Sequence, residues 1–283
     1  MSNGRPASEQ SIVWLDGALL DAGEARISPF DHGLLTGDGV FETLVVYDGR
    51  PFAVRRHLER LEGSCKGMGL DPPDPALVRS ALDAVVGANG LRSGRLRVTV
   101  TGGASPLGSD RGASGPTVVV AGGPLAGWPA TADVAVVPWV RNEKGALSGL
   151  KTTSYGENVV ALAFAKERGA SEAIFANTVG ELCEGTGSNV FLGIGGRLLT
   201  PPLRSGCLAG VTRALVLESV GAEEDDLPIA ALAGADEAFL TSTTREVQPI
   251  RAVDGVALPA APGPLTTAAA AAFKEVVSEN LDP

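Results

Sequence analysis

Residues 149–191, GLKTTSYGENVVALAFAKERGASEAIFANTVGELCEGTGSNVF, decide how the chain is interpreted. One lysine, Lys151, comes just before a segment with strong helix signals. One glutamate, Glu184, follows 33 positions later (184 − 151), directly before a Gly-Thr-Gly-Ser-Asn turn and an apolar strand. These two side chains are the candidate functional pair of the chain.

The residues around this pair predict a helix followed by strands. Ser154-x-x-Glu157 is a capping-box pattern, which predicts a helix over 155–168 and places Lys151 just before it. Further elements are predicted from apolar runs and turn residues. They are strands at 134–137, 172–176, 189–192, 197–200 and 238–240, and helices at 210–220 and 265–277.

The N-terminal half mixes strands with two consecutive helices. Strands are predicted at 12–15, 41–47, 52–54, 94–101 and 117–120, and helices at 56–70 and from residue 75 onward. The alternation over 94–101 places Arg95 and Arg97 on one face of a strand. In the second helix, the helical period places Leu77 among the buried residues. This order is not a regular series of strand–helix–strand units, so an α+β domain is expected here.

The composition allows two modest domains. The chain has 283 residues, of which 44% are hydrophobic, and residues 121–131, AGGPLAGWPAT, have the composition of a linker. We predict an N-terminal α+β domain over 1–122, a linker over 123–132 and a larger C-terminal mixed α/β domain over 133–283.

Charge and residue usage exclude several classes of partner. The net charge of −10 and the pI near 4.8 argue against a nucleic-acid backbone or an anionic membrane as partner. The start, MSNGRPASEQ, is polar and no later run is long enough to span a membrane, so a cytoplasmic protein is expected. Three cysteines without a close pair and only two histidines predict neither a disulfide framework nor a metal site.

A lysine with a distant carboxylate suits pyridoxal 5'-phosphate. The lysine holds the aldehyde of this cofactor as a Schiff base, and the carboxylate pairs with the pyridinium nitrogen. Tyr155, just beyond the lysine, is a candidate donor to the phenolate oxygen of the cofactor. Taken singly, Lys151 and Glu184 are equally compatible with ordinary solvated charges.

A phosphate group needs N–H groups at a helix N-terminus, hydroxyls and an arginine. Val211 and Thr212 begin a predicted helix and supply the amides. Ser242 and Thr243, at the end of a predicted strand, supply hydroxyls, and Arg60 is the candidate arginine.

These segments together resemble the class IV aminotransferases, the fold-type IV pyridoxal phosphate enzymes. That group contains the branched-chain and D-amino-acid transaminases and aminodeoxychorismate lyase. The resemblance extends from about Trp14 to Gly255, with the motifs in family order. Besides the lysine segment, the motifs are DHGLLTGDGVFET (31–43), HLERL (57–61), ELCEGTGSNVF (181–191), TPPLRSGCLAGVTR (200–213) and FLTSTTREVQPI (239–250).

The resemblance implies a role for each candidate. It implies Lys151 for the Schiff base and Glu184 at the pyridine nitrogen. It implies a phosphate site made of Arg60, Val211, Thr212, Ser242 and Thr243. It also implies a homodimer, in which the loop over 34–41 reaches the active site of the partner.

The substrate residues are less well defined. D-amino-acid transaminases carry an arginine that traps the substrate carboxylate where this chain has Thr101-Gly102-Gly103, and a tyrosine where it has Phe41. TSTTREV also lacks the Gly-Thr-Ala of the branched-chain enzymes. Arg97 coincides with a basic position in several members, so Arg97 and Phe41 are the first candidates for substrate binding. Arg111 and Arg141 are weaker candidates for the substrate carboxylate.

Two activities remain open at this level. We expect transamination between an amino acid and a 2-keto acid, because this activity is the commoner one in the family. The alternative is 4-amino-4-deoxychorismate lyase, which eliminates pyruvate to give 4-aminobenzoate with the same core residues. A distant alternative is a serine acyl-enzyme, because Ser148-x-x-Lys151 fits a pattern that needs both side chains on one helical face.

Overall fold

The computed structural model describes residues 11–283 and divides the chain into two compact units. Of the described residues, the N-terminal unit contains 11–126 together with 150–154 and 281–283, and the C-terminal unit contains 127–149 and 155–280. Residues 1–10, with which the predicted first domain begins, lie outside the described residues. The sequence placed Lys151 in the C-terminal domain, whereas the segment that carries it packs with the N-terminal unit.

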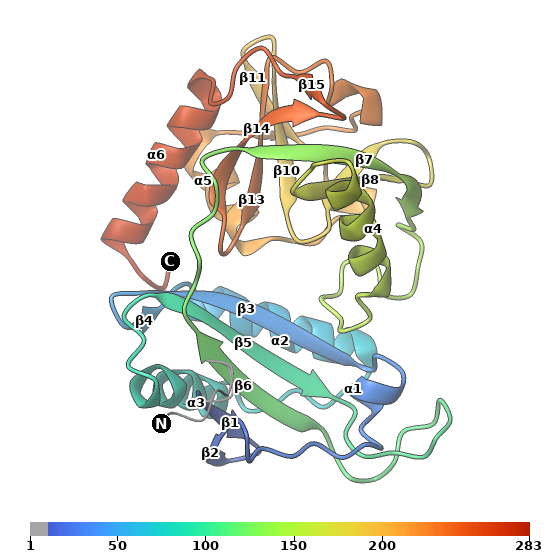
Figure 1. The fold of residues 1–283 in the computed structure, drawn as a ribbon, viewed down its shortest axis with the longest axis vertical. Coiled ribbons are helices and arrows are strands. Elements are labelled where there is room, and N and C mark those ends of the chain that lie inside the picture. Colours follow the sequence, from blue (N-terminus) through green and yellow to red (C-terminus); the bar gives the residue numbers. More distant parts are fainter. Residues whose placement is uncertain (1–10) are drawn as a thin grey trace. The chain divides into compact units, whose positions relative to one another are not determined.

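The N-terminal unit is built on an antiparallel sheet, drawn in blue to green in Figure 1. Its strands are β1 (Ile12–Leu15), β2 (Ala18–Asp21), β3 (Gly39–Tyr47), β4 (Arg50–Pro51), β5 (Gly94–Thr101) and β6 (Thr117–Gly123). They are arranged in the order β2-β1-β6-β5-β3-β4. β3 and β5 pair along their whole shared length, and Phe41 lies opposite Thr99.

Helices cover one set of apolar side chains of this sheet. They are α2 (Val54–Met68) and α3 (Pro75–Ala88), and the short helix α1 (His32–Leu35) precedes β3. α2 packs against β3, and α3 packs against β1 and β6. The alternation predicted for β5 is confirmed, because Leu96, Val98 and Val100 are buried in this core while Arg95 and Arg97 are exposed. The prediction for Leu77 is wrong: this side chain is 46% exposed, because it lies beside the buried stripe of α3 rather than in it.

The last three residues of the chain cap α2. Its N-cap residue, Ala53, has φ +54° and contributes no side-chain cap. Instead, the Ala53 amide donates to the carbonyl of Leu281 at 2.7 Å, and the Arg55 amide donates to Asp282 Oδ1 at 2.7 Å. The carboxylate therefore satisfies an amide that the first turn of a helix leaves without a partner, and it lies at the positive end of the helix dipole.

The C-terminal unit contains a mixed sheet. Its strands are β7 (Ala132–Arg141), β8 (Glu172–Asn177), β9 (Leu182–Gly185), β10 (Asn189–Ile194), β11 (Arg197–Thr200), β12 (Glu223–Glu224), β13 (Glu237–Ser242), β14 (Glu246–Val253) and β15 (Val256–Ala257). The order is β12-β11-β10-β13-β14-β7-β8-β9, with β15 paired to β14. β7 runs parallel to both β8 and β14. The predicted combination of helices and mixed strands in two parts is confirmed.

Three α-helices and two short 3₁₀ turns, η2 (Leu203–Ser205) and η3 (Ile229–Ala231), accompany this sheet. The helices are α4 (Gly156–Glu167), α5 (Val211–Val220) and α6 (Pro264–Glu279). α4 packs on β7 and β8, whereas α5 and α6 pack on each other and on β13 (Figure 1). No helix in the part of the chain that the structure describes is long and apolar enough to cross a membrane.

The predicted capping box of α4 is wrong. Tyr155 is the N-cap residue, and no side chain caps the helix. Ser154 Oγ instead donates to the carbonyl of Gly37 at 3.0 Å, because residues 150–154 belong to the N-terminal unit. Four strands of this unit, β9, β12, β14 and β15, were also missed from the sequence. In β9 and β14 the apolar residues are interrupted by polar ones such as Glu184 and Gln248.

Candidate active site

The backbone of Lys151 is fixed by the start of β3. The Phe41 amide donates to the Lys151 carbonyl at 2.9 Å, and the Thr153 amide donates to the Gly39 carbonyl at 2.8 Å. The amide of Lys151 itself donates to Ser64 Oγ of α2 at 3.2 Å. The lysine segment is therefore held like a short antiparallel strand on β3, which gives the side chain a defined starting position.

Residues 145–151 form turns and extended backbone, not a helix. Ser148 and Lys151 therefore do not share a helical face, and the arrangement that a serine acyl-enzyme of the SxxK type requires is absent from this segment. This alternative is rejected.

The ring of Phe41 brings two cations together in the N-terminal unit. Lys151 Nζ lies 4.4 Å from the ring centroid, and the guanidinium carbon of Arg97 lies 3.7 Å from the same centroid. Both distances are typical of cation–π contacts. Arg97 Nε also donates to Thr99 Oγ1 at 3.2 Å, which orients the guanidinium along β5. The structure thus brings together Lys151 and the two predicted substrate residues.

Arg60 is held by a buried carboxylate that the sequence reading did not single out. Its Nε and Nη2 donate to Glu42 Oε1 and Oε2, both at 2.7 Å, in a bidentate arrangement. His57 Nδ1 lies 2.7 Å from Glu42 Oε2. Glu42 and His57 are fully buried, whereas the Arg60 side chain is 14% exposed. A bidentate pair fixes the plane of a guanidinium, so Arg60 has a defined orientation.

The charges of this triad follow from burial and contact. Burial raises the pKa of Glu42, but the charge and hydrogen bonds of Arg60 and the hydrogen bond of His57 outweigh it and lower this pKa to about 2. Burial lowers the pKa of His57. The hydrogen bond and charge of Glu42 raise this pKa, whereas the positive charges of Arg60 and Lys151 lower it further, and the pKa stays below its ordinary value. His57 is therefore neutral at pH 7. Because an ionised carboxylate only accepts hydrogen bonds, Nδ1 carries the proton, and Nε2 is a buried acceptor without a hydrogen-bond partner in the described structure.

In the C-terminal unit, Glu184 lies on β9, and its two oxygens have different partners. Oε2 accepts from the Leu208 amide at 2.8 Å, and Oε1 lies 3.2 Å from Arg141 Nε at the end of β7. The guanidinium of Arg141 also stacks on Phe175, with 4.2 Å between its carbon and the ring centroid. The glutamate is therefore an oriented, ion-paired carboxylate with 13% of its side chain exposed.

The N-terminus of α5 is open to an anion. Gly210 is the N-cap residue, and no side chain accepts a hydrogen bond there. The amides of Val211 and Thr212, the first two of the helix, thus have no side-chain cap among residues 11–283, and they lie at the positive end of the helix dipole. A Cβ at Gly210 would lie 2.0 Å from Asn189 Oδ1, so the close approach of Asn189 requires glycine. These features fit a phosphate group.

The remaining predicted residues lie at element ends of the C-terminal unit. Ser242 is the last residue of β13, and Thr243 follows it in the turn to β14. Ser242 Oγ accepts from the Arg245 amide at 3.2 Å, so this turn is internally braced. Tyr155 is the N-cap residue of α4.

The two weaker arginine candidates are engaged in other contacts. Arg111 donates to both oxygens of Asp38 and to the carbonyls of Met68 and Gly69, which ties its loop to the end of α2. Arg141 faces Glu184.

The sequence contained a signal for the missed carboxylate. Glu42 is the single charged residue within the apolar strand GVFETLVVY, and a carboxylate inside a buried strand requires a cation nearby. His57 and Arg60 of HLERL are three positions apart, which places them on one face of a helix. The pairing of Glu42 with His57 and Arg60 could therefore have been predicted from the sequence pattern. The contact between Arg141 and Glu184 depends on the packing of β7 beside β8 and β9 and had no such signal.

Comparisons with known proteins agree with this geometry. The family model for amino-transferase class IV matches residues 39–253, and the chain belongs to that family. It is 33% identical to a D-alanine aminotransferase of Bacillus licheniformis, over 90% of this chain and 93% of that protein. It is 30% identical to the aminodeoxychorismate lyase of Bacillus subtilis, over 95% of this chain and 96% of the other.

Among solved structures, the chain is similar to a branched-chain aminotransferase from Thermoproteus uzoniensis crystallised with norvaline. The TM-score is 0.87 at 32% identity, covering 94% of each chain. The recognition of the family and the fold-type IV architecture are therefore confirmed, and the chain is an enzyme of this class. The family uses pyridoxal phosphate, and its members include transaminases and aminodeoxychorismate lyase.

Proposed function

We propose that this chain is a pyridoxal-phosphate-dependent transaminase that moves an amino group between an amino acid and a 2-keto acid. Family membership and the similarity to aminotransferases over most of the chain support the reaction class. The observation that carries the proposal is the cluster of Lys151, Phe41 and Arg97, in which a reactive amine and a carboxylate-binding cation contact the same aromatic ring.

Lys151 is proposed as the catalytic residue. The cofactor, when bound, supplies an aldehyde that exchanges amine partners and a ring that withdraws electrons from the α-carbon of the substrate. Nζ of Lys151 would hold the cofactor before substrate arrives, and would then take the proton from the substrate α-carbon as a base and deliver it as an acid. The hydrogen bonds of the lysine backbone to β3 and α2 keep Nζ within a small volume, which such proton transfers need.

Arg97 is proposed to bind the carboxylate of the substrate. Its guanidinium is exposed on β5 and lies over the Phe41 ring, on which Lys151 Nζ also lies. A guanidinium binds a carboxylate with two parallel hydrogen bonds. The Phe41 ring, which both cations contact, is proposed to form an apolar contact for the substrate.

Glu184 is proposed to hold the proton on the pyridine nitrogen. Its carboxylate has a fixed orientation, because the Leu208 amide donates to Oε2 and Arg141 lies beside Oε1. Tyr155 is proposed to donate to the phenolate oxygen, which its position at the start of α4 allows.

Arg60, the amides of Val211 and Thr212, and the hydroxyls of Ser242 and Thr243 are proposed to bind the phosphate. The amides at the α5 N-terminus have no side-chain cap, and Glu42 holds the Arg60 guanidinium in one plane. Together these groups supply the N–H donors and the positive charge that a phosphate needs.

A test of the cofactor proposal uses reduction in situ. Purified protein incubated with pyridoxal phosphate and then borohydride should carry the reduced cofactor on the peptide containing Lys151, as read by mass spectrometry. Lys151→Ala should show no covalent label and no turnover. Labelling of another lysine, or no uptake of the cofactor at all, contradicts the assignment.

A second test separates transamination from lyase activity. The enzyme is incubated in parallel with L- and D-amino acids plus 2-keto acids, and with aminodeoxychorismate. Transfer of the amino group in the first incubation supports the proposal. Release of pyruvate and 4-aminobenzoate in the second, without transfer in the first, assigns the lyase activity that the Bacillus subtilis relative carries by name.

We further propose that the chain forms a homodimer, as the family resemblance implies. In the N-terminal unit, Leu34 of α1 is 71% exposed, and in the C-terminal unit Val159 of α4 is 64% exposed. A dimer interface would cover side chains of this kind. Light scattering after size exclusion should give twice the mass of the chain, and a monomer would contradict the proposal.

A further inference from the structure

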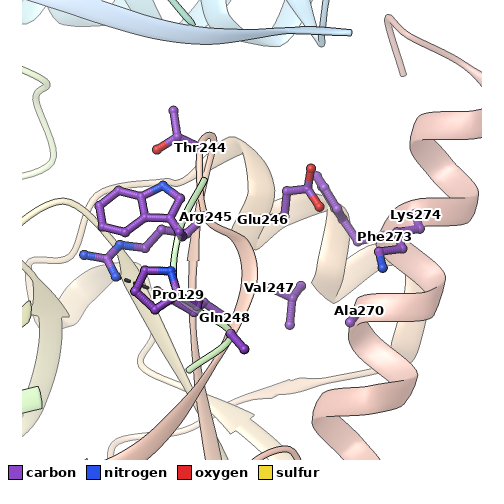
Figure 2. A pocket seen from close by; sticks show the side chains of 11 residues that line it. Pro129, Thr244, Arg245, Glu246, Val247, Gln248, Ala270, Phe273 and Lys274 are labelled. Carbon is purple, nitrogen blue, oxygen red and sulfur yellow. Dashed lines mark hydrogen bonds between the residues drawn. The ribbon is translucent and has the colours of Figure 1, made fainter. Parts of the chain in front are cut away.

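The C-terminal unit contains a cavity of about 300 Å³ beside the turn that carries Ser242 and Thr243. Its walls come from residues 128–130, from the turn between β13 and β14 with the start of β14, and from α6. Figure 2 shows Arg245, Gln248 and Pro129 close together on one side, and Phe273 and Lys274 on α6 at the other. Arg245 contacts several other segments of this unit.

Each end of the Arg245 guanidinium has a partner. Nη1 donates to Gln248 Oε1 at 2.5 Å, and Nη2 donates to the Ser171 carbonyl and to Glu172 Oε2, both at 3.3 Å. The side chains of Arg245 and Glu172 are 5% and 2% exposed, so this is a buried ion pair. A buried guanidinium held on both sides has little freedom to move.

The face of the same guanidinium lies on Trp128. Its carbon is 3.8 Å from the ring centroid, which is a close cation–π contact. Gln248 Nε2 also donates to the carbonyl of Pro129 at 2.7 Å. Trp128 and Pro129 belong to no helix or strand, so these two contacts hold them in the C-terminal unit without any strand pairing.

Arg245 also reaches both turns that carry the proposed cofactor residues. Its amide donates to Ser242 Oγ at 3.2 Å, which braces the turn of Ser242 and Thr243. Its ion-pair partner Glu172 accepts hydrogen bonds from the Thr186 amide and hydroxyl and from Ser188 Oγ. The turn that these residues form follows Glu184 directly.

We propose that Arg245 is a positioning residue that couples the seating of the Trp128–Pro129 segment to phosphate binding at the Ser242–Thr243 turn. The inference rests on the proposed function, because it takes that turn as part of the phosphate site. The backbone amide of Arg245 braces the turn, and the guanidinium of the same residue holds the indole through its face. A change at either end therefore alters the other, and the effect is reciprocal in binding free energy.

The probe is fluorine NMR of protein labelled with 5-fluorotryptophan. The chain has three tryptophans, Trp14, Trp128 and Trp139, and the resonance missing from Trp128→Leu identifies the signal of interest. Trp128 is 43% exposed, so its replacement leaves the core intact. The protein is titrated with pyridoxal phosphate and, separately, with inorganic phosphate.

The central variant is Arg245→Lys. It keeps a positive charge for Glu172 but lacks the planar fork and the broad face that lies on the indole. In the unsubstituted protein, both ligands should shift the Trp128 resonance at saturation. In Arg245→Lys the shift should be lost, and the Kd for pyridoxal phosphate should rise roughly tenfold. Trp128→Leu should also raise this Kd, by a smaller factor.

Arg251→Lys is the matched control. Arg251 lies on β14 of the same unit and pairs with Asp133 at the surface, so its replacement should change neither the Trp128 resonance nor the Kd. Unchanged cofactor affinity in Arg245→Lys, or in Trp128→Leu, overturns the inference.

Failure of the proposed function gives a different pattern. If the unsubstituted protein takes up no pyridoxal phosphate and neither ligand shifts any tryptophan signal, both proposals fail. If it binds the cofactor on Lys151 and Arg245→Lys binds it equally well, only the inference about Arg245 fails.

Discussion

Arg60 donates both of its 2.7 Å hydrogen bonds to a single buried carboxylate, that of Glu42 on the neighbouring strand. The arginine proposed for the phosphate is thus itself oriented by a partner that lies entirely inside the core. Its charge is also balanced within the protein before any ligand arrives. Two consequences of this pair can be measured separately, one in the stability of the fold and one in ligand affinity.

The pH dependence of stability should show the ionisation of Glu42. Its pKa in the folded protein, about 2, lies below the ordinary value of 4.5. The ionised carboxylate therefore stabilises the fold above pH 4.5, and this contribution is lost as the pH falls toward 2. The difference corresponds to roughly 3 kcal/mol.

The measurement is urea unfolding of the unsubstituted protein and of Glu42→Gln between pH 2.5 and pH 6. The glutamine resembles a protonated glutamate, so the stability difference between the two proteins should be large at pH 6 and should shrink at acid pH. A difference that stays constant across this range contradicts the assignment. Glu42→Asp serves if the glutamine variant does not fold.

Replacement of Arg60 by lysine should weaken cofactor binding. An ammonium cannot make the paired contact to Glu42, so the positive charge loses its fixed direction. We expect the Kd for pyridoxal phosphate to rise at least roughly tenfold, as is typical for loss of a charge-assisted hydrogen bond. Absorbance titration of the apoprotein measures it. Arg55→Lys, an exposed substitution on the same helix, should leave the Kd unchanged.

The close approach of Asn189 to Gly210 predicts a rescue experiment. Gly210→Ala should destabilise the protein by about 1–3 kcal/mol, because the new methyl group overlaps Asn189 Oδ1, and it should also weaken phosphate binding at α5. Asn189→Ala in the same chain removes the overlap.

A double-mutant cycle by thermal unfolding should therefore show the two changes to be strongly non-additive. Gly156→Ala is the control, because a Cβ at that glycine meets no atom within 4 Å. Additive effects of the two substitutions would show that the overlap is relieved by some other movement.

Arg97→Gln should raise the KM for the amino acid without changing the stability of the fold. The side chain is exposed, and it contacts Thr99 and one face of the Phe41 ring, so its loss removes a carboxylate partner while the ring itself stays in the core. The rise should be roughly tenfold or more, the range for a hydrogen bond to a charged group. Arg95→Gln, on the same exposed face of β5, is the matched control. Equal KM changes in both variants would assign the effect to general charge rather than to Arg97.

Local patterns anticipated most of the elements that carry the candidate residues. The alternation over 94–101 predicted β5, because a strand repeats every two residues. The glycine before Val211 predicted the start of α5, because it precedes the first helical residue. The motif order anticipated the family. The local sequence pattern did not predict the contacts of side chains whose partners are distant in the sequence.

Ser154 illustrates why. Its spacing to Glu157 is that of a capping box. Its hydroxyl instead donates a hydrogen bond to the carbonyl of Gly37, more than a hundred residues earlier in the chain. Arg141 and Arg245 are similar cases, since each contacts a glutamate on another strand. Such contacts depend on strand order in the finished sheet, which no window of neighbouring residues contains.

The placement of residues 150–154 has a consequence for dividing the protein. The chain passes from one unit to the other after residue 126, returns at 150, leaves again after 154 and returns once more at 281. A fragment that stops at residue 126 would lack both the lysine strand on β3 and the cap of α2. A fragment that starts at residue 127 would carry Lys151 without the strand and helix that hold its backbone. Neither half can be produced alone with its chemistry intact, so reassembly from two separately expressed pieces requires cuts at other positions.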